Sequence, residues 1–236
     1  MKKTLLITVI VSITVIACKK SSSTGSVAGT PKTGSSSNYF GEFMAAEGTL
    51  DSASNTYQQI LCLATFYKYP DSVITDAGTV KGAGSQLFQL FGSGSPYLYV
   101  AYGTFSQSKI PWSASGSPTV TALNYTCTKT LPTKPVPTSS LTVNRSAGYT
   151  FTCTGTDADS IEFKVDDGNF SAVKRLKGNA TTCTFSASEL STLSAGNSND
   201  SYIGVVGTNY ETATINGKKY LFQSARTHLK YKITIL

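Results

Sequence analysis

The chain has 236 residues, of which 40% are hydrophobic and only 14% are charged, and its formal net charge is +7. The charge is not gathered in one region: residues 39–130 carry four basic and five acidic side chains, and residues 141–236 carry ten and eight. No region is basic enough to predict a phosphate-binding face, so we expect no nucleic-acid partner.

The first 18 residues resemble a bacterial lipoprotein signal. Lys2 and Lys3 precede an apolar run at 5–16, as in a signal peptide. The run is shorter than the roughly 20 apolar residues that a transmembrane helix needs to cross a bilayer. The tetrapeptide VIAC at 15–18 resembles the lipobox, where the peptidase cuts before an acylated cysteine. The resemblance implies that residues 1–17 are removed and that Cys18 anchors the protein to a membrane. Because residue 19 is Lys and not Asp, it also implies the outer membrane.

The rest of the chain predicts four segments. Residues 18–38 comprise the lipidated cysteine and a Ser-rich tether, with a root-mean-square reach of roughly 25 Å. The composition, rich in Ser, Thr, Gly and Tyr, favours an all-β protein, and the length suits two domains of about 100 residues. We therefore expect two antiparallel β-sandwich domains in tandem, at 39–130 and 141–236. Residues 131–140 contain three prolines, which predicts a short semi-rigid linker between them.

Alternating apolar and polar residues predict the strands. The Asp167-Gly168 and Asn216-Gly217 pairs predict hairpin turns, and residues 188–193 one helical turn. The strand order in the second domain resembles an immunoglobulin-like sandwich, although no Trp lies on its third strand. The predicted strands are 39–50, 57–67, 78–81, 86–90, 97–105 and 119–128 in the first domain, and 141–144, 149–154, 160–165, 170–176, 181–185, 202–209, 213–215, 218–223 and 229–235 in the second.

Four cysteines remain after Cys18, which is compatible with two disulfides in an oxidising envelope. The immunoglobulin-like resemblance implies that Cys153 and Cys183 lie on neighbouring strands of one sheet, so they are the preferred pair. Cys62 and Cys127 then pair by elimination. The chain has no CxxC motif, so neither a redox motif nor a zinc knuckle is predicted.

No catalytic motif is present: the chain has no GxSxG elbow, no HExxH and no glycine-rich phosphate loop. His228, the only histidine, is interpreted as a surface or turn residue that opens the last strand. The acids of two consecutive loops fall at opposite ends of a meander, and we interpret them as turn formers. These acids are Asp157, Asp159, Asp166 and Asp167. We expect no enzyme, no cofactor and no metal site.

The candidate ligand-binding residues are aromatic. Tyr97 and Tyr99 share one face of a predicted strand, and Trp112 follows shortly after. If the opposite face is the core, these rings point outward and form a platform on which sugar rings stack. The alternative is that the tyrosines cover the sheet or an interface between domains.

The lipobox, the Ser-rich tether and the predicted sandwiches together resemble the small uncharacterised outer-membrane lipoproteins of Bacteroidota. The stretches AGTVKG at 77–82, PWSASG at 111–116 and INGKKY at 215–220 are similar to strand and hairpin patterns that recur in them. The resemblance implies a lipid-anchored envelope protein that binds a glycan or another envelope protein. A structural or adhesive surface component is the alternative, and a hydrolase is the third.

The lipobox resemblance makes a direct prediction. In a bacterial host, Cys18→Ser should abolish incorporation of labelled palmitate and leave the precursor uncleaved, because the peptidase acts only on the acylated cysteine. Gel fluorography and the intact mass measure both effects. Unchanged labelling of the variant would contradict the prediction.

Overall fold

The computed structural model describes residues 39–52, 55–68, 73–90, 98–102 and 109–236. These residues form an all-β protein, as the composition predicts, in which several sheets pack together as a sandwich. The one helix in these ranges is the four-residue α2 (Ala187–Leu190), which overlaps the helical turn predicted at 188–193. No helix in the described part of the chain is long and apolar enough to span a membrane.

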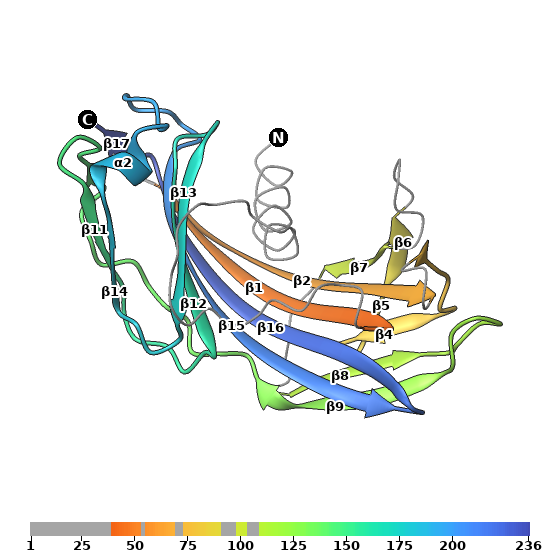
Figure 1. Cartoon of the computed structure of the whole chain (residues 1–236). Coiled ribbons are helices and arrows are strands. Elements are labelled where there is room, and N and C mark those ends of the chain that lie inside the picture. Colours follow the sequence, from red (N-terminus) through yellow and green to blue (C-terminus); the bar gives the residue numbers. More distant parts are fainter. Residues whose placement is uncertain (1–38, 53–54, 69–72, 91–97, 103–108) are drawn as a thin grey trace.

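A nine-stranded sheet runs through the whole molecule, and we call it the long sheet (Figure 1). Its neighbours pair antiparallel, with one exception treated below. In spatial order its strands are β13 (Ser171–Lys177), β12 (Ser160–Asp166), β15 (Tyr202–Ile215), β16 (Lys218–Tyr231), β1 (Gly41–Ser52), β2 (Asn55–Lys68), β7 (Leu98–Tyr102) and β6 (Phe88–Leu90), with β3 (Val73–Ile74) also pairing with β2.

The exception is the pairing of β1 with β16, which is parallel and joins the two halves of the chain. It runs over eleven residues, from Gly41 opposite Tyr220 to Asp51 opposite Lys230. The prediction placed these two strands in separate tandem sandwiches. Instead, both halves contribute strands to a single sheet, because β1 has the hairpin strand β2 on one side and β16 on the other. An immunoglobulin-like identity of residues 141–236 stays a prediction.

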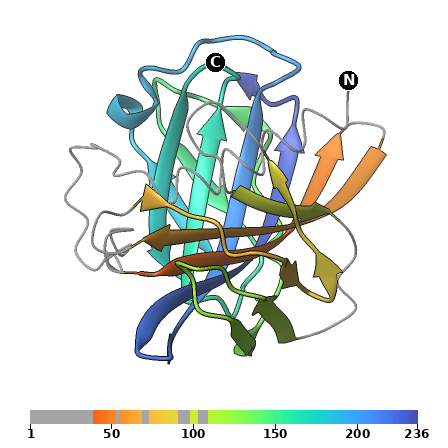
Figure 2. The same ribbon diagram turned by 90° about the vertical axis from the view of Figure 1, so that its right-hand side faces the viewer.

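Smaller layers cover one side of the long sheet, one layer at each end (Figures 1 and 2). At one end lies a four-stranded sheet, and at the other lie two short ladders and α2. The four-stranded sheet has the order β5 (Ser85–Gln86), β4 (Val80–Gly82), β8 (Lys109–Ala114) and β9 (Leu123–Thr130), and the ladders pair β10 (Thr142–Val143) with β17 (Thr234–Ile235) and β11 (Tyr149–Thr152) with β14 (Thr182–Phe185).

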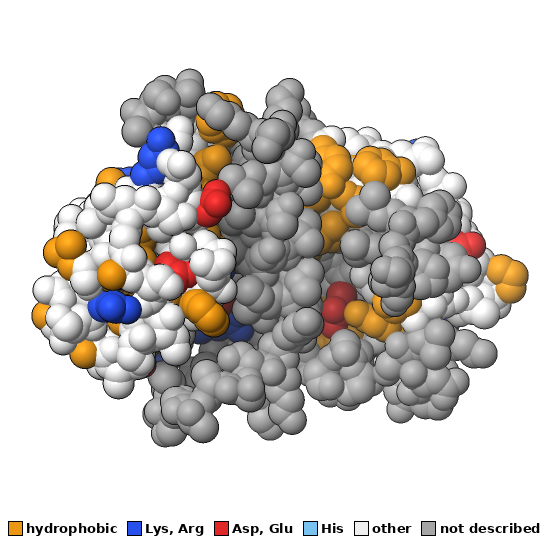
Figure 3. Space-filling model, turned by 90° about the horizontal axis from the view of Figure 1, so that it is seen from above, with side chains coloured by type: hydrophobic (Ala, Val, Ile, Leu, Met, Phe, Trp, Pro, Cys, Tyr) orange, Lys and Arg blue, Asp and Glu red, His pale blue; other side chains and the backbone are white. Residues whose placement is uncertain are grey.

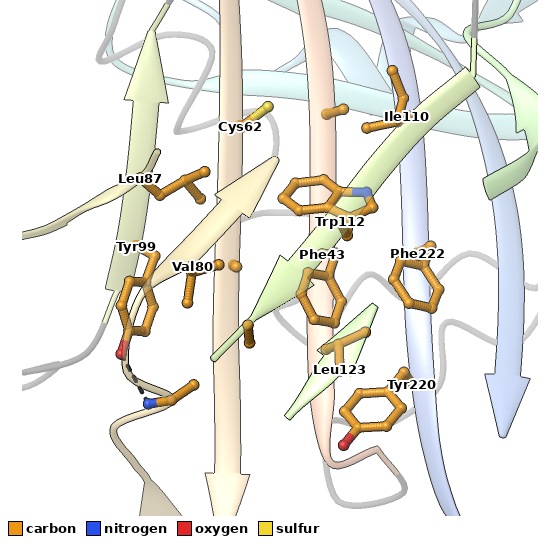
Figure 4. Close-up of a cluster of buried hydrophobic side chains, with 14 of the residues drawn as sticks. Phe43, Cys62, Val80, Leu87, Tyr99, Ile110, Trp112, Leu123, Tyr220 and Phe222 are labelled. Carbon is orange, nitrogen blue, oxygen red and sulfur yellow. Dashed lines mark hydrogen bonds between the residues drawn. The ribbon is translucent and has the colours of Figure 1, made fainter. Parts of the chain in front are cut away.

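Each of these layers closes a hydrophobic core against the long sheet. The first core centres on Phe43, whose ring stacks on Phe222 at 4.7 Å and lies 5.1 Å from the ring of Trp112 (Figure 4). The second core centres on Phe151 and Phe163, whose rings meet edge to face at 5.2 Å. Since Phe43 lies on β1 and Phe222 on β16, the first core depends on strands from both halves of the chain.

The Glu211 carboxylate on β15 fastens the four-stranded sheet to the long sheet. It accepts hydrogen bonds from the backbone N–H groups of Thr128 and Lys129, at 2.9 and 3.0 Å, and from the hydroxyl of Tyr125. These donors stabilise the charged form, and together they hold the pKa of Glu211 below its usual value.

The proline-rich segment 131–140 lies against the sheets. The carbonyl oxygen of Pro132 accepts a hydrogen bond from the Arg226 guanidinium at 3.2 Å, and Pro137 forms a bridge with Cys153. The local turn predictions are confirmed: Asn216 and Gly217 have φ of 52° and 73° between β15 and β16. Both angles lie in the left-handed region that a two-residue hairpin turn requires.

The first core makes a prediction about stability. Phe43→Ala should lower the free energy of unfolding by about 3–5 kcal/mol, because it removes a fully buried ring from contact with four others. Urea denaturation measures the change. Phe88→Ala is the matched control, since that ring is 50% exposed, and its effect should stay below about 1 kcal/mol. Equal effects of the two variants would contradict the prediction.

Candidate functional site

The predicted aromatic platform is wrong for two of its three residues, and Tyr97 lies outside the described residues. Tyr99 and Trp112 are each only 1% exposed and belong to the first core (Figure 4). The Tyr99 hydroxyl donates a hydrogen bond to Asp76 at 2.6 Å and accepts one from the backbone N–H of Ala77 at 2.9 Å. Both faces of β7 are covered, since Val100 on the other face is also buried, so the strand has no outward side at these positions.

Trp112 is held by a close approach that only glycine permits. A Cβ atom built on Gly82 would lie 2.4 Å from the indole ring, which is too close for any side chain. Gly82 and Trp112 are opposite each other in the pairing of β4 with β8. The indole therefore packs directly on the backbone of the neighbouring strand, as a core residue does.

The predicted disulfides are absent, and the four cysteines of the described residues are free thiols. Cys183 lies on β14, and Cys153 directly follows the neighbouring strand β11. The residue opposite Cys183 in this pairing is Phe151, two residues before Cys153. This diagonal offset places the two Cβ atoms further apart than a disulfide needs. Cys62 and Cys127 share the first core but come from different sheets.

Burial explains why these thiols stay protonated. It raises the pKa of Cys62 and Cys127 to about 12, and of Cys153 and Cys183 to about 11. The thiolate is the nucleophilic form, so these cysteines are poor nucleophiles at neutral pH.

The loop acids hold backbone and lysine groups in place. Asp157 accepts a hydrogen bond from the backbone N–H of Thr133, and Asp159 forms an ion pair with Lys129 at 2.5 Å. Asp167 is 5% exposed and binds the backbone N–H groups that follow it in its own turn. Within the described ranges, no cluster of His, Cys, Asp and Glu could hold a metal ion.

The interpretation of His228 as a surface residue is wrong, because the residue lies inside β16 and is 4% exposed. Its Nε2 lies 2.6 Å from a carboxylate oxygen of Asp51, and its Nδ1 is buried without a hydrogen-bond partner. A neutral ring that donates from Nε2 fits this geometry, because protonation of Nδ1 would bury an N–H group without an acceptor. Burial accordingly lowers the pKa of His228.

The feature that sequence reasoning missed lies on the other side of the long sheet. The long strands bend so that this side is concave, and we call it the concave face (Figure 1). A third hydrophobic cluster lines it, and every member comes from the long sheet itself. The buried members are Met44, Ala46, Leu61, Val100, Tyr202, Val206, Ala225, Leu229 and Tyr231, with Leu50, Tyr57 and Leu63 packed beside them.

No second layer of described residues contributes to this cluster, in contrast to the first two cores. Figure 3 looks down on this side of the molecule, where hydrophobic side chains are visible on the left and on the right of the view. The alternation of β1 and β16 was legible in the sequence, but the sequence did not show that strands of both halves would gather a third cluster on this side.

The middle of the concave face carries small side chains. Ala46 on β1 is opposite Ala225 on β16 and Leu61 on β2, and Gly48 is opposite Thr227. The seam between β1 and β16 is therefore formed by small residues on this face.

A charged cluster on β12 and β13 borders the third hydrophobic cluster at Tyr202. Lys164 pairs with Asp166 at 2.8 Å and donates a hydrogen bond to the Tyr202 hydroxyl at 2.6 Å. Glu162 pairs with Arg175 at 2.6 Å. Lys164 and Glu162 are 5% and 7% exposed, so both pairs are largely removed from water. The four charges balance, which is what buried ion pairs require.

Two buried polar atoms on this face have no hydrogen-bond partner, and they are the hydroxyl of Tyr231 and Oε1 of Gln59. Tyr231 shares the face with Leu229, and Gln59 shares it with Leu61, because side chains alternate along a strand. The Tyr231 ring stacks on Tyr202 at 5.1 Å, beside the charged cluster. A buried polar atom without a partner is costly, so these two atoms are exceptions among the buried polar groups of the described residues.

No family model matches this chain, and no curated protein matches it. The candidate site therefore rests on the geometry of the concave face.

His228 makes a prediction about pH. In the unfolded chain it titrates near 6.5, whereas its pKa in the folded protein is lower, so the unfolded state binds the proton first as the pH falls. The free energy of unfolding should therefore drop between about pH 7 and pH 5. His228→Gln should lose this dependence, since the chain has no other histidine. Urea midpoints at several pH values measure it, and identical pH slopes for both proteins would contradict it.

Proposed function

We propose that this protein is a non-catalytic, lipid-anchored envelope protein that binds a partner on its concave face. Cys18 is its anchor and the outer membrane its location, as the lipobox resemblance implies. The observation that carries the proposal is the apolar cluster on the concave face, built only from the long sheet.

The energetics support a binding role for this face. Each Leu, Val or Met side chain that leaves water contributes about 1.5–3 kcal/mol. The nine buried members of the cluster are only 1–8% exposed, so they form a buried apolar layer on this side of the sheet. The partner that gains most here presents apolar groups of its own.

The observations favour such a partner over a glycan. Sugar rings stack on exposed aromatic rings, and Tyr99 and Trp112 are buried in the first core. The concave face is lined mainly by aliphatic side chains, among them Met44, Leu61 and Leu229. A structural or adhesive component that adds strands to a sheet edge is opposed at one edge of the long sheet, where β13 carries Lys174, Arg175 and Lys177. Charged side chains on an edge oppose further pairing.

Site-specific photocrosslinking in intact cells tests the proposal. The photoreactive residue p-benzoylphenylalanine replaces Tyr57, a half-buried ring on the concave face. Irradiation should give an adduct with whatever the face binds. The same residue in place of Phe170, which is 56% exposed in the turn between β12 and β13, is the control and should give none. The absence of any adduct at position 57 would refute the proposed function.

A further inference from the structure

We infer that one end of the long sheet docks on the surface of a bilayer that contains anionic phospholipids. We call it the tether end, and it consists of Tyr39, Phe40 and the hairpin tip between β15 and β16 at 215–219. The inference rests on the lipid anchor of the proposed function and adds how the folded part lies at the membrane. It combines the place where the tether joins the fold with the charges and aromatic rings found there.

The start of the described chain lies beside the tip of the β15–β16 hairpin (Figure 1). The backbone N–H of Phe40 donates a hydrogen bond to the carbonyl oxygen of Lys219 at 2.8 Å. The next residue, Gly41, is opposite Tyr220 in the pairing of β1 with β16. The predicted tether at 18–38 therefore joins the fold at this end. Its reach of roughly 25 Å lets the tether end touch the surface that holds the anchor.

Two lysines and two aromatic rings lie together at the tether end. The Nζ atom of Lys218 is 5.0 Å from the ring centroid of Phe40, and that of Lys219 is 5.3 Å from the ring centroid of Tyr39. Lys219 is exposed and the other three residues are half-buried, so a flat surface can contact all four. Tyrosine rings are enriched where lipid meets water, and lysines are attracted to anionic head groups there.

The turns that form this end contain no acidic residue. The turn at 115–122 lies beside the hairpin tip, since Lys218 Nζ is 3.5 Å from the Thr121 hydroxyl and Asn216 donates a hydrogen bond to the carbonyl of Ala122. Neither this turn nor the hairpin tip contains Asp or Glu. The two lysines thus face an approaching surface without a carboxylate beside them in these turns.

Two acids of the described residues lie near this end, and each is held by a tyrosine. Glu42 on β1 accepts a hydrogen bond from the hydroxyl of Tyr67 at 3.3 Å. Asp76 accepts one from the hydroxyl of Tyr99 at 2.6 Å, and its side chain also binds the backbone N–H of Gly78. Both carboxylates are therefore fixed within the fold by their own partners.

The predicted tether adds positive charge to this end. It carries Lys19, Lys20 and Lys32 and no acid. Each lysine that reaches an anionic surface favours the docked state about fivefold. Two lysines would hold a freely diffusing protein only weakly. An anchor at Cys18 keeps the tether end at a high effective concentration beside the lipid, so weak attraction is sufficient for docking.

Fluorescence quenching on the full acylated chain tests the inference. The fluorophore NBD is attached to Thr214→Cys, an exposed position on β15 next to the hairpin turn. Burial raises the pKa of the four cysteines in the described ranges to about 11 or 12, so the new thiol is the one that reacts. Phospholipids with spin-labelled head groups should quench it in vesicles that contain phosphatidylglycerol. Equal quenching in pure phosphatidylcholine vesicles would overturn the inference.

A second label shows whether the contact is confined to the tether end. Val173→Cys on β13 is the control position, because Val173 is 38% exposed and its row of the long sheet leads through Lys164 and Gly204 to Leu229. That row is ten residues along β16 from Lys219, or about 33 Å. NBD at this position should stay unquenched. Quenching as strong as at Thr214→Cys would overturn the inference.

Charge variants test the role of the lysines. Lys218→Gln combined with Lys219→Gln should lower the ratio of docked to undocked molecules about thirtyfold, at about fivefold for each lysine. Lys230→Gln combined with Lys232→Gln removes the same charge at the opposite end of β16 and should leave the ratio unchanged. Equal ratios for the two double variants would overturn the inference.

Flotation of the same vesicles separates this inference from the proposed function. Protein that floats with both kinds of vesicle is anchored, and quenching at Thr214→Cys then decides the inference alone. Floating protein without quenching leaves the proposed anchor standing and overturns the docking. Acylated protein that fails to float overturns both.

Discussion

The architecture depends on the parallel pairing of β1 with β16. Arg226 and Glu47 form an ion pair across this seam although they are 179 residues apart in the chain. The pairing fuses a hairpin from the first half and a hairpin from the second half into one sheet. Without it, Phe43 would lose Phe222, and the first core would lose the strand against which its layer packs. The concave face would also be cut in two, since Ala46 and Ala225 meet only through this seam.

The same seam explains the polar side chains buried on the opposite side. Side chains alternate along β1 and β16, and one face of these strands carries Phe43 and Phe222 into the first core. The same face carries Glu47, Asp51 and His228 between the two covering layers. Here the start of the proline-rich segment crosses, and its carbonyl at Pro132 binds Arg226. The carboxylates here have partners, because an unpaired charge at a buried junction would be destabilising: Glu47 pairs with Arg226, and Asp51 lies 2.6 Å from the neutral ring of His228.

The local part of this structure could be predicted from the sequence, and the nonlocal part could not. The Asn216-Gly217 turn and most strands follow from alternation and turn residues, whose causes lie within a few residues. Alternation assigned Tyr99 correctly to one face of its strand, but it cannot say that both faces are covered. The predicted break at 131–140 was reasonable from its prolines, yet the sheet continues past it through β1 and β16. The concave face was out of reach for the same reason, since its apolar residues come from five strands of both halves.

The place where the described chain starts relates the fold to the proposed anchor. The described chain starts beside the four-stranded layer, where the backbone N–H of Phe40 binds the carbonyl of Lys219 at the first turn of the sheet. The predicted tether to Cys18 reaches roughly 25 Å, while β1 with 12 residues extends about 40 Å. The proposed tether is thus shorter than the long strands, and an anchor at Cys18 would hold the folded part within about one strand length of a lipid surface.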